Sequence, residues 1–78
     1  MSADELLVDF MEWEALFLKV DKNENLVVPI KSYTCRVFQH NMISALKEAV
    51  DTMIDNVEPP EGTSMRIVKL ENLDFLKR

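Results

Sequence analysis

The sequence NMISALKEAVDTMIDNV, residues 41–57, separates its apolar and polar side chains onto two sides of a helix. The apolar residues recur at steps of three and four, which is the spacing of one face of a helix with 3.6 residues per turn. They are Met42, Ile43, Ala45, Leu46, Ala49, Val50, Met53, Ile54 and Val57. The prolines of EPPEG, residues 58–62, prevent the helix from continuing. We therefore expect one long amphipathic helix over residues 41–57, buried against another element.

The N-terminal part of the chain predicts a second helix. Ser2 and Glu5 match a capping box just before an apolar run, so this helix is expected to begin at Ala3 and to end near Trp13. A hairpin then follows, with strands over residues 16–20 and 26–30 and a polar turn at 21–25. The alternative is one helix from Ala3 to Lys19, because helical spacing also continues that far.

The turn and the segments after it indicate further strands. Asn23 and Asn25 are suited to left-handed backbone conformations in the turn, and Pro29 should restrict residues 26–30 to an edge strand or a bulge. Residues 33–38 are rich in β-formers but also fit the first turns of the long helix. Residues 65–70 predict a third strand. The expected fold is thus α+β: N-terminal helix, antiparallel hairpin, long helix and C-terminal strand; the alternative is mostly α, with two long helices.

Composition predicts a single small domain that has more apolar residues than it can bury. The chain has 78 residues, of which 47% are hydrophobic, and a domain of this size buries only roughly 60% of the surface of its unfolded chain. We expect residues 1–78 to form one domain whose surplus apolar surface binds a second copy or another protein. The acidic N-terminus and the short apolar runs argue against a leader or a membrane span, which favours a cytoplasmic protein.

The acidic residues of the long helix form a candidate partner-binding strip. Glu48, Asp51 and Asp55 lie three and four residues apart, where like charges on a helix repel each other. Either a basic surface of a partner relieves this repulsion, or basic residues of the same chain do. The candidates within the chain are Arg66, Lys69, Lys77 and Arg78.

The residue types of catalytic and metal sites are sparse. Cys35 is the only cysteine, which excludes an internal disulfide and a cysteine-rich zinc site. Its spacing of five from His40 places the two on different sides of a helix or a strand. We expect Cys35 to be a buried apolar residue, His40 to be a polar residue near the start of the helix, and Asp51 and Asp55 to be solvated. No catalytic residue, metal or cofactor is predicted, and a single glycine, Gly62, leaves no phosphate-binding loop.

Bases and aromatic residues alternate in one short stretch, at Lys31, Tyr33, Arg36 and Phe38. This pattern is typical of surfaces that stack nucleic-acid bases, and it makes Lys31, Tyr33 and Arg36 candidate nucleic-acid contacts. The sequence pI of about 4.7 argues against direct binding of nucleic acid. A further aromatic group is expected to belong to the core, with a partner site as the alternative: Phe10, Trp13 and Phe17.

The tail places three large apolar residues near the C-terminus: Leu73, Phe75 and Leu76. We expect them to pack on the body of the protein or on another chain. The resulting functional hypothesis is a small, acidic, non-catalytic regulator or adaptor that binds another protein and forms a homodimer. The interface between the two subunits would be formed either by an edge strand or by this tail. The alternative is a modulator of a nucleic-acid-handling enzyme, acting by acidic mimicry or by direct contact through Lys31 and Arg36.

Overall fold

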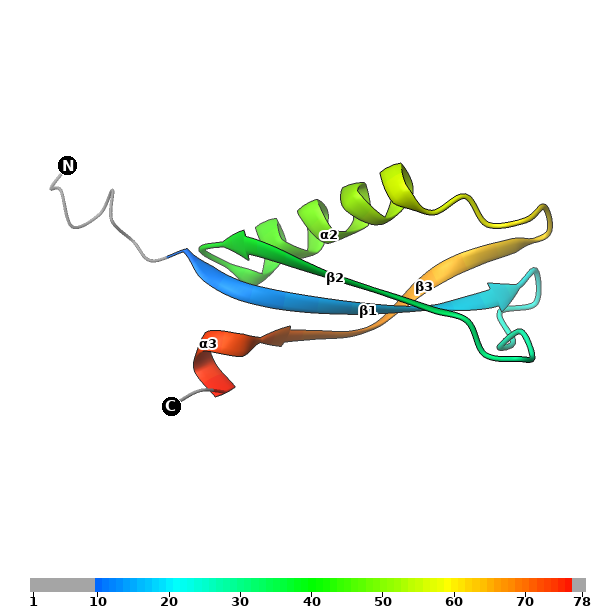
Figure 1. The fold of residues 1–78 in the computed structure, drawn as a ribbon, viewed down its shortest axis with the longest axis horizontal. Coiled ribbons are helices and arrows are strands. Elements are labelled where there is room, and N and C mark those ends of the chain that lie inside the picture. Colours follow the sequence, from blue (N-terminus) through cyan, green and yellow to red (C-terminus); the bar gives the residue numbers. More distant parts are fainter. Residues whose placement is uncertain (1–9, 77–78) are drawn as a thin grey trace, which may run out of the picture.

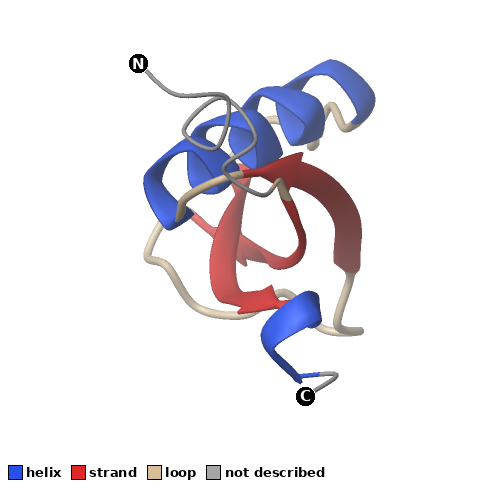
Figure 2. Ribbon diagram, turned by 90° about the vertical axis from the view of Figure 1, so that its left-hand side faces the viewer, coloured by secondary structure: helices blue, strands red, loops and turns tan. Residues whose placement is uncertain are grey.

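The structure is a computed structural model that describes residues 10–76, and it shows one antiparallel sheet with a helix on each side. The elements in chain order are β1 (Met11–Asp21), β2 (Ser32–Gln39), α2 (Met42–Asn56), β3 (Thr63–Asn72) and α3 (Leu73–Leu76). The sheet has the order β2-β1-β3, so β1 is central. The long helix α2 covers one face, and the short helix α3 lies on the opposite side (Figures 1 and 2).

The predicted hairpin is wrong, and the predicted N-terminal helix does not extend to Trp13. Residues 11–13, which were expected to end that helix, begin β1, which then runs without interruption to Asp21; the part of the predicted helix in residues 3–9 lies outside the described residues. Along β1, Trp13, Ala15 and Phe17 are buried in the core, whereas Glu12 and Glu14 point to the other face. A central strand gains neighbours on both edges, so the two-residue period prevails over the helical spacing. The mostly α alternative fails for the same reason.

The segment expected to be the second hairpin strand forms no strand. Between Asp21 and Ser32 the chain makes a single bridge, from Leu26 to Val20. The turn is ordered by Asp21, whose Oδ1 accepts hydrogen bonds from the backbone N–H groups of Asn23 and Asn25 at 2.8 and 3.0 Å. Glu24, rather than either asparagine, has the left-handed conformation, with φ 64°. The strand that pairs with β1 on this edge is β2 instead.

The later elements agree better with the sequence. The long helix is confirmed, and Asn41 caps it by accepting a hydrogen bond from the Ser44 N–H at 2.8 Å. Residues 33–38 belong to β2, so the helical alternative for them is wrong. The third strand is confirmed and is longer than expected, and it leads directly into α3.

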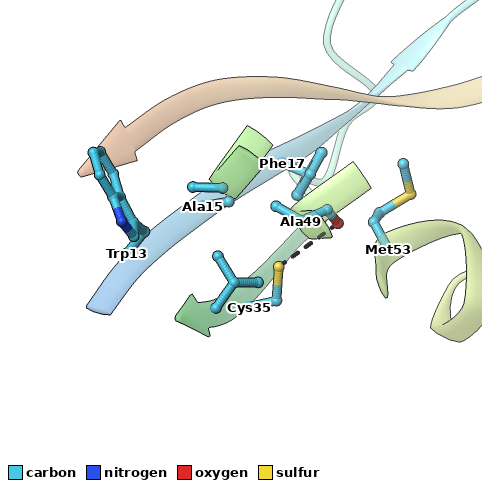
Figure 3. Packing of buried hydrophobic residues seen from close by; sticks show 8 residues of the cluster. Trp13, Ala15, Phe17, Cys35, Ala49 and Met53 are labelled. Atoms are coloured by element: carbon cyan, nitrogen blue, oxygen red, sulfur yellow. Dashed lines mark hydrogen bonds between the residues drawn. The ribbon is translucent and has the colours of Figure 1, made fainter. Parts of the chain in front are cut away.

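The core lies between α2 and the first two strands, and it is small. Eight buried residues form it: Trp13, Ala15, Phe17, Cys35, Val37, Ala45, Ala49 and Met53. Three of these are alanines with no exposed surface, so the helix can approach the sheet closely (Figure 3). Phe17 is the one large side chain among the described residues that is fully buried. A core of this size leaves many apolar side chains partly outside.

The described part of the molecule is elongated, because β1 and β3 run along its long axis (Figure 1). An elongated body encloses less volume for its surface than a round one, so fewer apolar side chains can be buried.

Candidate functional site

An open cleft lies between α2 and β3. The helix packs mainly on β2 and touches β1 less, so it leaves most of the third strand uncovered. Met65, Ile67 and Leu70 of β3 point toward the helix side and pack against the edge of the core, but they stay only half-buried. A sheet face that is apolar and half-covered is a surface that another element can cover.

The helix contributes the other wall of this cleft. Val50, Ile54 and Val57 share one flank of α2 because they are four and three residues apart. Ile54 and Val57 line a hollow of about 550 Å³ together with Met65, which shows that this flank faces β3. We call this surface the α2–β3 cleft. Its lining residues are Met53, Ile54, Asp55, Asn56, Val57, Glu58, Pro59, Ser64 and Met65.

A tight turn closes one end of the α2–β3 cleft. The Thr63 N–H donates to the Pro60 carbonyl oxygen at 3.0 Å, and the Thr63 hydroxyl donates to the same oxygen. Gly62, the third residue of this turn, has φ 83°, as a type II turn requires. The turn fixes the direction in which the chain leaves α2 and enters β3, and so it sets the position of Met65 opposite Ile54.

The rim of the cleft is acidic. Asp55 and Glu58 line the hollow, and Asp51 lies one turn earlier on α2. In the described part of the chain, no ion pair involves any of these three carboxylates. The last turn of α2 has no basic residue, so the negative end of the helix dipole adds to the same potential. This rim would favour a positively charged group beside it.

The predicted acidic strip is thus divided by the structure. Glu48 faces β2 and accepts a hydrogen bond from Gln39 Nε2 at 2.7 Å, whereas Asp55 belongs to the cleft. The idea that Arg66 and Lys69 neutralise the strip is wrong, because Arg66 pairs with Glu24 and Lys69 pairs with Glu71. Lys77 and Arg78 lie outside the described residues.

The candidate nucleic-acid contacts do not share a surface. Tyr33 points to the helix side and packs against Phe17, with the ring centroids 6.2 Å apart. Arg36 lies on the opposite face, within 3.1 Å of Glu14 and 3.6 Å of Glu12. Lys31 precedes β2 and is exposed. Because two carboxylates neutralise Arg36, this face offers phosphate little positive charge.

The tail is docked on β1, away from the cleft. Asn72 caps α3 by accepting a hydrogen bond from the Phe75 N–H at 2.8 Å, and Asp74 accepts one from the Glu12 N–H at 3.1 Å. Leu73 is half-buried, whereas Phe75 is 70% exposed. The Leu76 side chain lies outside the described residues. The tail therefore packs on the body, as one of the two expectations stated, and leaves Phe75 in solvent.

Cys35 and His40 form no catalytic pair. Cys35 is buried, as expected, and its thiol lies 3.8 Å from the Ala49 carbonyl oxygen (Figure 3). Burial raises the pKa of this thiol, and the nearby Glu48 carboxylate raises it further, so it stays protonated and poorly nucleophilic. His40 is exposed and stacks on the Phe10 ring, with centroids 5.8 Å apart. Of the predicted aromatic group, Phe10 is thus outside the core.

Comparisons with protein-family models, with curated proteins and with solved structures found no match. None of the described helices is long and apolar enough to cross a membrane. Within residues 10–76, no group of three or more histidine, cysteine or acidic residues has the arrangement of a metal site. The α2–β3 cleft is therefore the candidate site with the most structural support.

Sequence reasoning missed most of this site. It found Asp55, but it did not single out Ile54, Val57, Pro59 or Met65 as residues of one surface. The available signal was the apolar content of β3. Residues 65, 67 and 70 carry apolar side chains that must be buried against something, and one helix that packs mainly over the other two strands cannot bury them fully.

Proposed function

We propose that this chain is a small, non-catalytic regulator or adaptor of the cytoplasm that binds another protein through the α2–β3 cleft and forms a homodimer. One observation carries the proposal: Ile54 and Val57 at the end of α2 and Met65 near the start of β3 line one open hollow.

The chemistry of the cleft describes the partner segment. Ile54 is 62% exposed, and burying a side chain of this size stabilises a complex by about 1.5–3 kcal/mol. Asp55 and Glu58 stand beside it without ion pairs within the described residues. The segment that fits best inserts an apolar side chain between Ile54 and Met65 and places a lysine or arginine against the rim. Such charges mainly set orientation and association rate.

Exposed apolar side chains support the homodimer. Among the described residues, Val68 of β3 is 52% exposed, and Val28 and Ile30 of the segment between β1 and β2 are 86% and 62% exposed. A second copy of the chain would cover part of this apolar surface.

Selection of peptides on the purified protein tests the cleft. We expect selected peptides to share an apolar anchor with a neighbouring lysine or arginine. Ile54→Lys should weaken their binding about tenfold or more, because it removes the apolar wall that the anchor packs on. Asp55→Asn with Glu58→Gln should weaken binding less and should reduce its salt dependence. Fluorescence anisotropy measures each affinity.

Ile43→Lys is the matched control. Ile43 is on the same helix and has a similar exposure to Ile54, but it does not line the hollow. It lies roughly 16 Å away along the helix. Peptides that bind the Ile54→Lys and Ile43→Lys variants equally well would contradict a site in the cleft, as would a selection without any basic residue beside the anchor.

A further inference from the structure

The central irregularity of β3 defines how this strand could pair with a second copy of itself. In the register with β1, Leu16 lies opposite Lys69 and Phe17 lies opposite Ile67, so Val68 is an extra residue in a β-bulge. Val68 is 52% exposed and Lys69 is exposed, and neither belongs to the residues packed against the core. The side chains of Val68 and Lys69 therefore point away from the core side of β3.

Because of the bulge, the alternation of side chains between the two faces of β3 is symmetric about a point between Val68 and Lys69. Ile67, which precedes Val68, and Leu70, which follows Lys69, both point to the helix side. Arg66 and Glu71 then point to the opposite face, because they pair with Leu18 and Glu14. Met65 and Asn72 come next and return to the helix side, opposite Lys19 and Trp13.

We infer that the proposed homodimer forms by antiparallel pairing of β3 with β3 of a second copy, about a twofold axis between Val68 and Lys69. In this register Ile67 lies opposite Leu70 of the partner subunit, and Arg66 lies opposite Glu71 of the partner subunit. Every pair has both side chains on one face, as antiparallel pairing requires.

Neighbouring registers break this match. An axis at Val68 would set Ile67 against Lys69, and an axis at Lys69 would set Val68 against Leu70. Each pairs a side chain on the helix side with one on the other face, which a continuous sheet does not accommodate. Of these three registers the bulge selects one, and it is the register that sets opposite charges against each other twice in the dimer.

The surroundings of β3 favour this edge over the other one. Among the described residues, β3 has β1 as its one strand partner, and α2 packs mainly on β2 rather than on β3. An exposed edge strand of ten residues offers its unpaired backbone groups to another strand. Pairing would join two sheets into one and would cover the exposed Val68 with its neighbour on the second copy.

Disulfide trapping tests the register in the full chain carrying Cys35→Ala. The matched pair is Arg66→Cys with Glu71→Cys, which the twofold axis brings together between subunits. Within one chain these positions are roughly 16 Å apart along the strand and cannot be bridged. The control pair consists of the single variants Arg66→Cys and Glu71→Cys, in which this register keeps the two cysteines of a dimer roughly 16 Å apart along the strand. We expect the matched pair to give about tenfold more covalent dimer than the control on mild oxidation.

Charge exchange gives a second measurement that needs no disulfide. Arg66→Glu should weaken the dimer about tenfold, because it sets two acidic residues against each other at both ends. Adding Glu71→Arg should restore the wild-type dissociation constant. This inference rests on the proposed homodimer, and light scattering separates the two. A monomer at micromolar concentration would overturn both. A dimer in which the matched and control pairs cross-link alike, or in which the second charge change fails to restore pairing, would overturn the register alone.

Discussion

Cys35 couples the stability of the fold to alkaline pH. Its thiol is packed between β2 and the Ala49 carbonyl oxygen of α2, and burial raises its pKa above the ordinary value of 9.0. The folded protein therefore holds this proton more tightly than the unfolded chain does. Below pH 9 both states are protonated and the group has no effect on pH dependence. As the pH rises above 9, the unfolded chain loses the proton first, so the free energy of unfolding falls.

Urea unfolding at about pH 8 and about pH 10 measures this effect against Cys35→Ala. Lysine and tyrosine residues also titrate in this range, so the difference between the two proteins is the relevant quantity. We expect the wild type to lose more stability than the variant over the same interval. Equal losses in both proteins would show that the thiol titrates alike in the folded and unfolded states.

At the scale of elements, the contact between α2 and the sheet depends on alanines. Ala45 and Ala49 are fully buried on the side of the helix that faces Ala15 and Cys35, and their small size permits a close approach. Ala49→Leu would add three carbon atoms where no space exists. We expect it to lower the free energy of unfolding by about 1–3 kcal/mol, because overpacking forces side chains from their preferred rotamers.

Lys47→Leu is the control for this substitution, since Lys47 is exposed on the same helix and both residues are good helix formers. It should change the unfolding free energy by about 0.5 kcal/mol or less. Urea denaturation monitored by the fluorescence of Trp13 measures both variants. A similar loss of stability in both would contradict close packing at Ala49.

Elements marked by local signals could be predicted from the sequence, whereas elements that depend on distant pairing could not. The body and the end of α2 are marked locally, by its apolar spacing and by Pro59 and Pro60 beyond its end, whereas its start was left open because residues 33–38 also fit its first turns. β1 was missed because residues 10–17 fit both a helical and an alternating period. What decides between them is pairing with β3, which begins more than forty residues later. The α2–β3 cleft depends on where the helix lies across the sheet, and no local pattern encodes that position.

For the whole molecule, elongation and charge layout point in one direction. The core is thin, several large apolar side chains are exposed, and the acidic rim of the cleft lies apart from the ion-paired outer face. On that outer face Arg36 pairs with Glu14, and Lys69 pairs with Glu71. The carboxylates of the cleft rim, Asp55 and Glu58, form no ion pair within residues 10–76 and have more need of a charged partner than this face does, so we expect the bound segment rather than the second copy to supply the positive charge there.

A protein stabilised by a second copy should unfold at a temperature that depends on its own concentration. Dissociation accompanies unfolding of a dimer, so a hundredfold increase in concentration favours the folded state by about 2.7 kcal/mol per dimer. Given the entropy of unfolding of two such chains, the midpoint should rise by roughly 8 °C. Scanning calorimetry or circular dichroism measures it. Arg66→Glu should lower the midpoint most at the lowest concentrations, where its weaker dimer dissociates first. A midpoint that stays constant over this range would mean that one chain folds and persists alone.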